Sequence, residues 1–189
     1  MRIITGKYRG RKLLESTKFK DLRPTSDKNR ENLFNILFSS KEIVKTGFAI
    51  ENCDFLDVFA GSGAVSLEAL SRGAKSASLL EKSRDHLNLA KENAENFGEE
   101  NLKYFCFDLS KKIPSADKQY NLIFIDPPYN KNLVQISLQN LLESGWISNN
   151  AIIIIEHSID EKLENISEEF EVLLVRKYKE TVFSFLRKI

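Results

Sequence analysis

Short apolar runs alternate with amphipathic segments through the middle of the chain. Apolar runs of strand length occupy residues 54–59, 77–80, 102–107, 122–125 and 151–155. Segments with the 3.6-residue period of a helix separate most of these runs, at residues 64–72, 83–98 and 133–142. Strands without a polar face are typical of a sheet that is covered on both sides, and helices between strands are typical of parallel crossovers. The pattern therefore predicts an α/β fold, with a mostly parallel sheet and helices on both faces.

Both ends of the chain depart from this alternation. Residues 170–177 and 181–187 are strand-like with only three residues between them, which predicts an antiparallel hairpin that closes a seven-stranded sheet. Near the N-terminus, residues 1–14 predict a small hairpin, residues 15–24 a charged loop, and Ser26 the N-cap of a helix. We therefore expect a hairpin-like N-terminal extension at residues 1–22 and one α/β domain at residues 23–189.

The composition agrees with a single folded domain. The chain has 189 residues, of which 42% are hydrophobic and 13 are Phe, so it can form a large core and is not intrinsically disordered. Its longest apolar run, residues 151–155, is far shorter than the roughly 20 residues of a membrane-spanning helix. The basic N-terminus has no apolar signal segment, and the two cysteines have no disulfide-scaffold or metal-ligand spacing. We expect a cytoplasmic protein that binds no metal.

Charge is distributed unevenly along the chain. The whole chain has 28 Lys and Arg against 27 Asp and Glu, a net charge of +1. Residues 1–30 contain ten basic and three acidic side chains, a net charge of +7, and the remaining residues have a net charge of −6. This asymmetry favours a basic arm that binds a polyanion, with a solvated terminus as the alternative. The basic side chains at the start of the arm are Arg2, Lys7, Arg9, Arg11 and Lys12.

Glycines mark the junction between the first central strand and its helix, in the sequence Asp57-Val-Phe-Ala-Gly61-Ser-Gly63. Glycine lets the backbone approach a ligand closely, and the helix N-terminus offers free N–H groups. A dinucleotide fingerprint would need a third glycine where the chain has Ser66, and a P-loop would need Gly-Lys-Ser/Thr. Asp57 would repel a pyrophosphate and would suit a ligand with an ammonium or sulfonium cation. The motif therefore disfavours a nicotinamide enzyme.

Two further acids stand at or just beyond the ends of predicted strands. Glu81 lies 18 residues after Gly63, where a carboxylate can accept hydrogen bonds from both hydroxyls of a ribose. The alternative for Glu81 is a cap on the helix that begins near Ser83. Asp108 follows the strand at residues 102–107, and by its order it would lie beside an adenine, with an ordinary loop carboxylate as the alternative.

The sequence Asp126-Pro127-Pro128-Tyr129 follows the strand at residues 122–125. Paired prolines fix the backbone and remove two N–H donors, so the loop presents carbonyl oxygens beside the Asp126 carboxylate. The exocyclic amine of a nucleobase fits between Asp126 and the Pro127 carbonyl, and the Tyr129 ring can stack on the base. These acceptors give the nitrogen lone pair more sp³ character, so that it can attack an electrophilic methyl group. A rigid turn with an aromatic plug is the structural alternative.

Together these motifs resemble the class I S-adenosylmethionine-dependent methyltransferases that act on amino groups. DVFAGSG at residues 57–63 is similar to their cofactor loop, and DPPY at residues 126–129 is similar to their catalytic loop. MRIITGKYRGRKL and RPTSDKNRENLFNIL narrow this to a resemblance to the bacterial 16S rRNA (guanine(966)-N(2))-methyltransferase family. The resemblance extends over the whole chain and implies a Rossmann-like methyltransferase domain at residues 23–189.

The resemblance also implies a role for each motif. Arg23, Pro24 and Thr25 would lie against the methionine end of the cofactor. The implied cofactor-binding residues are Arg23, Thr25, Asp57, Phe59, Gly61, Gly63, Glu81 and Asp108, and the implied catalytic residues are Asp126, Pro127, Pro128 and Tyr129. The arm residues Arg2, Lys7, Arg9, Arg11 and Lys12, and Lys179 in the C-terminal hairpin turn where Gly is common in the family, would contact RNA. His157 either faces the site or is a satisfied histidine at a strand end.

The sequence therefore predicts transfer of a methyl group from S-adenosyl-L-methionine to the exocyclic N2 amine of a guanine in 16S rRNA, with S-adenosyl-L-homocysteine as the product. Adenine-N6 methylation of DNA or RNA is an alternative, because enzymes of that type use the same DPPY loop. A non-catalytic RNA-binding or assembly module on the same fold is another. We expect 16S rRNA, free or in an assembling 30S subunit, as the partner of a monomeric protein.

Overall fold

The buried apolar runs become strands in both of the units into which the chain divides, Met1–Cys106 and Phe107–Ile189. The computed structural model describes residues 1–15, 25–129, 132–161, 163 and 166–189. Within these residues it has seven strands, five of them in parallel pairs and the last two in an antiparallel hairpin. The predicted α/β class, with a mostly parallel sheet and a C-terminal hairpin, is confirmed.

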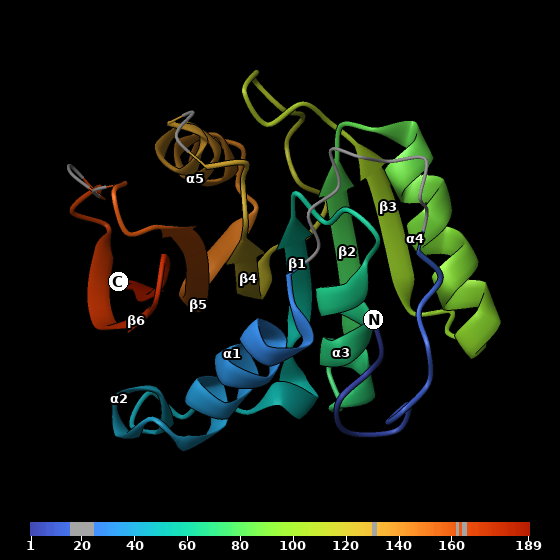
Figure 1. Cartoon of the computed structure of the whole chain (residues 1–189). Coiled ribbons are helices and arrows are strands. Elements are labelled where there is room, and N and C mark those ends of the chain that lie inside the picture. The colour runs from blue at the N-terminus through green and yellow to red at the C-terminus, as the bar shows by residue number, and fades with distance from the viewer. Residues whose placement is uncertain (16–24, 130–131, 162, 164–165) are drawn as a thin grey trace. The chain divides into compact units, whose positions relative to one another are not determined.

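A parallel sheet of order β3-β2-β1 forms the centre of the first unit. Its strands are β1 (Asp54–Val58), β2 (Ser76–Glu81) and β3 (Leu102–Cys106). The helices α3 (Ala64–Ser71) and α4 (Arg84–Phe97) connect these strands and lie on the same side of them (Figure 1). Every residue of α3 is buried, and apolar side chains of the arm pack against its residues Ala64 and Leu67.

Helix ends in this unit follow the capping residues of the sequence. The Ser83 hydroxyl accepts a hydrogen bond from the His86 amide at 3.3 Å at the start of α4, and Gly98 ends the helix in the left-handed conformation. Helix α1 (Asp27–Ser39) begins in the same way at Ser26. The sequence pattern did not predict the one-turn helix α2 (Lys41–Val44) or the 3₁₀ turn η1 (Ile50–Asn52), which are too short to show a helical period.

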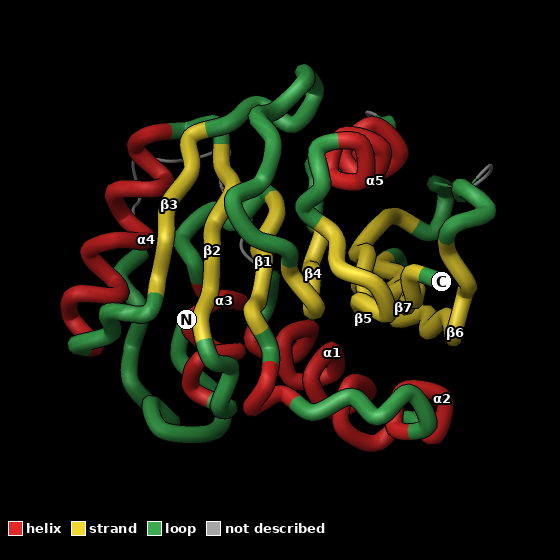
Figure 2. The backbone as a smooth tube through the Cα atoms, turned by 180° about the vertical axis from the view of Figure 1, so that it is seen from behind, coloured by secondary structure: helices red, strands yellow, loops and turns green. Residues whose placement is uncertain are grey.

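The second unit is a mixed sheet of order β4-β5-β7-β6 (Figure 2). Its elements are β4 (Tyr120–Ile125), α5 (Leu133–Glu143), β5 (Ile147–Ser158), β6 (Phe170–Tyr178) and β7 (Thr181–Lys188). Strands β4 and β5 are parallel, whereas β7 is antiparallel to both β5 and β6. The hairpin turn is Lys179-Glu180, and Lys179 has a positive φ of 55°.

Strand β5 is longer than the apolar run that predicted it. The sequence predicts a strand at residues 151–155, but β5 extends from Ile147 to Ser158. At its start the register against β4 shifts, and Asn150 has a φ of 59°, so polar residues precede the apolar run without breaking the strand. At its end, Glu156, His157 and Ser158 pair with β7 and are buried. Cross-strand pairing, which an apolar pattern does not encode, sets both ends.

The N-terminal arm, residues 1–15, forms the predicted hairpin, but it is a structural part of the first unit. One antiparallel bridge joins Arg2 and Lys12, and Ile3 donates to the Arg11 carbonyl at 3.0 Å. Three apolar side chains of the arm are buried in a cluster with α3 and α4, namely Ile3, Tyr8 and Leu13. The boundary predicted between residues 22 and 23 lies outside the described residues.

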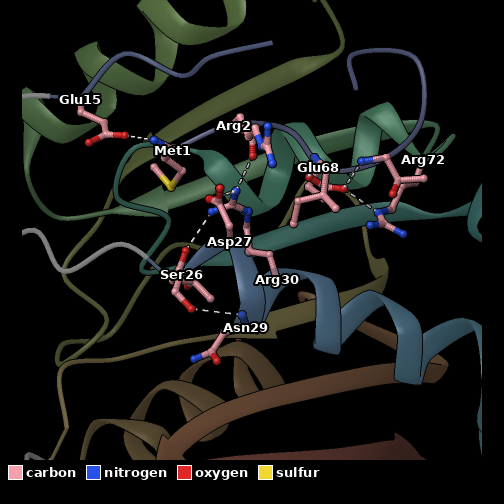
Figure 3. Close-up of polar contacts among 12 residues, drawn as sticks. Met1, Arg2, Glu15, Ser26, Asp27, Asn29, Arg30, Glu68 and Arg72 are labelled. Atoms are coloured by element: carbon pink, nitrogen blue, oxygen red, sulfur yellow. Dashed lines mark hydrogen bonds and ion pairs between the residues drawn. The ribbon is translucent and has the colours of Figure 1, made fainter. Parts of the chain in front are cut away.

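A buried carboxylate fastens the arm to α3. Glu68 is fully buried, and its oxygens accept hydrogen bonds from the amides of Ile4 at 2.8 Å and Thr5 at 3.1 Å. Arg72 donates to the same carboxylate from Nε at 2.8 Å, and its guanidinium lies 4.7 Å from the centre of the Phe34 ring on α1 (Figure 3). The arm, α3 and α1 therefore meet around one ion pair.

A buried guanidinium makes the second link. Arg30 on α1 is fully buried and donates to the carbonyl oxygens of Arg2 at 2.6 Å and Thr25 at 2.8 Å (Figure 3). The Asp27 carboxylate, 2.9 Å away, compensates its charge. Because an uncompensated buried charge costs several kcal/mol, both ends of this link must be in place in the folded unit.

No helix among the residues that the structure describes is long and apolar enough to cross a membrane.

Gly6 and Gly10 offer a direct test of how closely the arm is docked. Both have a positive φ, of 88° and 82°. A Cβ at Gly6 would lie 1.8 Å from the Ser71 carbonyl oxygen, whereas a Cβ at Gly10 would meet nothing within 4 Å. We expect Gly10→Ala to lower the free energy of unfolding by about 1 kcal/mol through backbone strain alone. Gly6→Ala should cost about 3 kcal/mol or more, because it also displaces the arm. Urea denaturation of both variants measures the difference, and equal losses would contradict the docked arm.

Candidate functional site

The loop after β1 is built from left-handed backbone. Phe59, Gly61 and Gly63 have φ values of 67°, 53° and 74°, and the amides of Phe59 and Ala60 both donate to the Leu80 carbonyl of β2. A positive φ is strained for a phenylalanine, and such strain is concentrated at ligand-binding loops. A Cβ at Gly63 would lie 3.1 Å from Ala90 and Leu79 side-chain atoms, so glycine allows the loop to pack on α4 and β2. The predicted cofactor loop is therefore rigid and tightly turned.

Asp57, in β1, fixes the start of the helix that follows this loop. It is buried, and its Oδ2 accepts hydrogen bonds from the Ser66 amide at 3.0 Å and the Ser66 hydroxyl at 2.7 Å. Ser66 lies in the first turn of α3, where amides have no partner within the helix. Burial raises the pKa of the Asp57 carboxyl to about 7, against the opposing effect of the Ser66 hydrogen bonds, and the nearby charge of Glu81 adds to the rise. Asp57 therefore caps a helix, a role that its position in the strand did not suggest.

Glu81 lies at the end of β2 and faces the glycine loop. Its side chain is buried, with Oε2 3.2 Å from the Gly61 amide and Oε1 2.9 Å from the Ser83 amide. His86 Nδ1 is 3.7 Å from the same carboxylate. Glu81 therefore contacts the N-cap residue of α4, but it is buried and not the surface cap of the alternative, and its contact with Gly61 places the carboxylate at the loop. Each carboxylate oxygen has two lone pairs, so these contacts leave acceptor capacity for a ligand.

The two predicted cofactor residues ahead of α1 are placed only in part. Arg23 lies outside the described residues, as does Pro24. Thr25 is partly buried, and its carbonyl oxygen accepts the hydrogen bond from Arg30 described above.

In the second unit, Asp108 is a partly buried loop residue. Its Oδ1 accepts hydrogen bonds from the Ser110 amide at 3.1 Å and hydroxyl at 2.6 Å, and Lys111 Nζ lies 3.8 Å from Oδ2. These contacts form a local turn and fix the direction of the carboxylate.

The loop Asp126 to Tyr129 directly follows β4, which is buried along nearly its whole length. Pro127 is buried and Pro128 exposed, while Asp126 and Tyr129 are partly buried. A rigid loop at the end of a buried strand places the Asp126 carboxylate and the Tyr129 ring in fixed positions. The four predicted catalytic residues, which are consecutive in the sequence, therefore lie in one short loop at the end of β4.

The Tyr129 hydroxyl is fastened to the neighbouring strands. It donates to Glu156 Oε1 of β5 at 3.3 Å and lies 3.4 Å from Thr181 Oγ1 of β7. Burial raises the pKa of the Tyr129 phenol to about 12, and the charges of Glu156 and Asp126 add to the rise. The phenol is therefore neutral and can donate. Its ring is held at both the backbone and the hydroxyl.

His157 is a satisfied structural residue. It is buried, with Nδ1 2.9 Å from the Ser158 carbonyl oxygen and Nε2 3.0 Å from the Ser184 hydroxyl. Both ring nitrogens have a partner, as expected for a histidine at a strand end.

The predicted RNA contacts are exposed, with one important difference among them. Arg2, Lys7, Arg9, Arg11, Lys12 and Lys179 all have exposed side chains. Arg11 also donates to the carbonyl oxygens of Asn96 and of Phe97, the latter at 3.2 Å, and its guanidinium lies 4.4 Å from the centre of the Phe97 ring. Lys7 Nζ lies 3.8 Å from Glu99. Arg11 therefore caps the C-terminal carbonyl oxygens of α4, whereas Arg9, at the turn of the arm, is exposed to solvent.

Sequence reasoning missed four buried or partly buried polar residues. They are Glu68, Arg30, Glu156 and Thr181. Glu68 and Arg72 did give a signal, because they are an i, i+4 acid–base pair in an otherwise apolar helix. Glu156 and Thr181 gave none, since strand pairing alone brings them to Tyr129. Among the described residues, no three His, Cys, Asp or Glu side chains are grouped so that they could hold a metal ion.

Known proteins are similar to this chain over most of its length. The family described as conserved hypothetical protein 95 matches residues 1–187. Ribosomal RNA small subunit methyltransferase D of Escherichia coli is 37% identical over 171 residues, which cover 88% of this chain and 79% of that protein. The protein of the same name from Haemophilus influenzae is 35% identical over 170 residues, which cover 86% and 81%. A solved Escherichia coli structure that has the name methyltransferase yhhF covers 100% of this chain and 97% of its own, with a TM-score of 0.81 at 29% identity.

The raised pKa of Asp57 predicts how stability depends on pH. The carboxyl has a pKa of about 7 in the folded protein against its usual 3.8, so the folded state binds the proton more tightly than the unfolded chain. The free energy of unfolding therefore falls as pH rises from about 4 to about 7 and is lowest above that window. The side-chain amide introduced by Asp57→Asn cannot titrate, and its oxygen can still accept from Ser66. We expect a smaller fall in the variant. Urea denaturation at pH 5 and pH 8 measures it, and equal falls in both proteins would contradict the assignment.

Proposed function

The chain belongs to the ribosomal RNA small subunit methyltransferase D family, and from this premise we propose that it transfers a methyl group from S-adenosyl-L-methionine to the exocyclic N2 amine of a guanine in 16S rRNA. The observation that most strongly supports this proposal is the rigid loop Asp126 to Tyr129 at the end of β4, with its tyrosine hydroxyl fastened to β5 and β7. Such a loop would hold an amino group in position for attack on an electrophile.

The first unit has residues that fit the cofactor. Glu81 directs a carboxylate to the glycine loop and has lone pairs for the two hydroxyls of a ribose. The strained Phe59 and the left-handed Gly61 would line the carboxy-amino part, with Arg23 and Thr25 at the methionine end. Asp57 and Gly63 would act through the loop, by capping α3 and by packing on α4. In the second unit Asp108 would accept from the adenine amine.

At the catalytic loop the chain's own residues would prepare the attacking amine. When bound, S-adenosyl-L-methionine supplies the electrophilic methyl group. The Asp126 carboxylate and the Pro127 carbonyl would accept hydrogen bonds from the two N–H groups of the guanine amine, and Pro128 would keep the loop rigid. The Tyr129 ring would stack on the base. Asp126 or water would take the proton, which becomes acidic only after methylation. Most of the rate enhancement would come from positioning the amine for in-line attack.

RNA binding would be the task of the exposed cations. The target guanine must leave its stack to reach Asp126, which costs a few kcal/mol and least for an unpaired nucleotide. Arg2, Lys7, Arg9, Arg11 and Lys12 on the extension at residues 1–22, with Lys179 on the domain at residues 23–189, would contact phosphates. We infer a monomeric, cytoplasmic enzyme that acts on 16S rRNA, free or in an assembling 30S subunit.

Product analysis tests the proposed reaction. The purified protein, incubated with S-adenosyl-L-methionine and unmodified 16S rRNA or 30S subunits, should yield N2-methylguanosine after digestion of the RNA to nucleosides. N6-methyladenosine would instead support the adenine-directed alternative. If no methylated nucleoside forms on either substrate and calorimetry shows no binding of S-adenosyl-L-methionine, the protein is a non-catalytic module.

The matched variant for this assay is Asp126→Ala. It removes the acceptor that positions the amine, so we expect turnover to fall at least about a hundredfold, the usual contribution of such positioning. The dissociation constant for S-adenosyl-L-methionine should stay within about twofold. Turnover close to that of the unmodified protein would remove Asp126 from the catalytic role.

The salt dependence of RNA binding tests the proposed phosphate contacts of the arm. If about five phosphates are neutralised on single-stranded RNA, the slope of log K against log salt concentration is near −3.5, or about −0.7 for each contact. Arg9→Ala should make the slope less negative by about 0.7 without loss of stability, because the structure directs Arg9 to solvent. Arg11→Ala should also lower the melting temperature, since it removes the contacts with Asn96 and Phe97. An unchanged slope in Arg9→Ala would remove Arg9 from the proposed phosphate contacts.

A further inference from the structure

The strand register at the C-terminal hairpin aligns two rows of side chains beside Tyr129. Residues that pair directly in antiparallel strands place their side chains on the same face. One row runs across three strands as Tyr178, Thr181 and Ser158, and the next as Arg176, Phe183 and Glu156. Successive rows on one face are two residues apart along each strand, so these six side chains share one face of β6, β7 and β5.

This is the face to which the catalytic loop is fastened. The Tyr129 hydroxyl contacts one member of each row, Thr181 at 3.4 Å and Glu156 at 3.3 Å. The outer members of the same rows are Tyr178 and Arg176 on the edge strand β6. An aromatic ring and a guanidinium therefore extend the surface on which Tyr129 lies, one strand further out.

Both outer residues are accessible, and a neighbouring ring holds Tyr178. Arg176 is exposed, and Tyr178 is partly buried, with its ring 6.1 Å from the Phe183 ring at 67°, an edge-on contact. An edge-on contact supports the ring while leaving a face free for stacking. Two cations flank Tyr178: Arg176 on the same face of β6, and Lys179 in the hairpin turn that follows. An aromatic face with adjacent cations is the combination that binds single-stranded nucleic acid.

Building on the proposed function, we propose that Tyr178 and Arg176 hold the RNA nucleotide next to the flipped target base, with Tyr178 stacking on its base and Arg176 bound to its phosphate. The target base leaves its stack to reach the catalytic loop, so the adjoining base loses a neighbour. Tyr178 replaces that lost stacking. The pair would thereby favour a single-stranded or bulged target over a paired one.

The hairpin supplies matched controls for a test. Lys177 is exposed and adjacent to Arg176 in the sequence, but it pairs with Val182 on the opposite face. Tyr178→Phe keeps the stacking face, whereas Tyr178→Leu keeps the apolar contact with Phe183 and has no aromatic face. The variants are compared in binding of a fluorescent single-stranded 12-mer RNA that contains a guanine, in kcat/KM for 16S rRNA, and in affinity for S-adenosyl-L-methionine.

We expect Tyr178→Leu to weaken RNA binding and lower kcat/KM by roughly tenfold to a hundredfold, the loss for one stacked base, while Tyr178→Phe stays near the unmodified protein. Arg176→Ala should make the slope of log K against log salt less negative by about 0.7, and Lys177→Ala should leave it unchanged. Affinity for S-adenosyl-L-methionine should not change in any variant.

The two proposals fail in different ways. Suppose the unmodified protein methylates guanine, but Tyr178→Leu binds RNA as tightly as Tyr178→Phe, and Arg176→Ala has the same salt slope as Lys177→Ala. The hairpin proposal is then overturned, and the proposed function stands. If the variants weaken RNA binding as expected but no methylated guanine forms, the stacking and phosphate contacts of the hairpin stand, and the proposed function fails.

Discussion

The buried carboxylate of Glu68 is the interaction on which the first unit depends. A charge without exposure to water must have its partners in place, and Glu68 has the amides of Ile4 and Thr5 on one side and Arg72 on the other. Arg72 in turn lies over the Phe34 ring of α1. The arm, α3 and α1 therefore stabilise one another in the folded unit, and residues 1–15 of the basic segment are anchored at a fixed position.

The glycine loop of the first unit and the Asp126 to Tyr129 loop of the second, each taken by itself, show the same physical arrangement. In the first unit a strained loop rests on a buried acid, since Asp57 caps α3 and Glu81 receives the Gly61 amide. In the second unit a proline-stiffened loop is fastened through the Tyr129 hydroxyl. In each case a polar group that does not itself contact the proposed reacting atoms restricts the motion of the loop that would contact them. Preorganisation of this kind lowers the entropic cost of reaching a reactive geometry.

The sequence predicts the elements whose position depends on burial and on local capping. It does not predict the strand ends and side-chain partners that depend on a distant segment of the chain. Ser83 and Gly98 bound α4 as predicted, because a cap acts within one turn. The apolar run at residues 151–155 locates β5 but not its ends, which register with β4 and β7 extends to Ile147 and Ser158. From the sequence alone, Asp57 is expected to bind a cationic ligand. Nothing in the sequence shows that its carboxylate accepts hydrogen bonds from Ser66 instead. The partners of Tyr129 come from strands 27 and 52 residues further along, beyond the reach of any local pattern.

The way the arm is fastened has a consequence for the order of folding. Ile4 bonds to Glu68, 64 residues away, and the Tyr8 hydroxyl bonds to Glu99, 91 residues away. Contacts of such long sequence separation form only after the entropy of closing a large loop has been overcome. The arm leaves the ribosome before α3 and α4 do, yet it is among the last parts of its unit to find its place. A nascent chain that has not yet completed α4 displays a free, strongly basic arm beside the very RNA-rich particle that synthesises it.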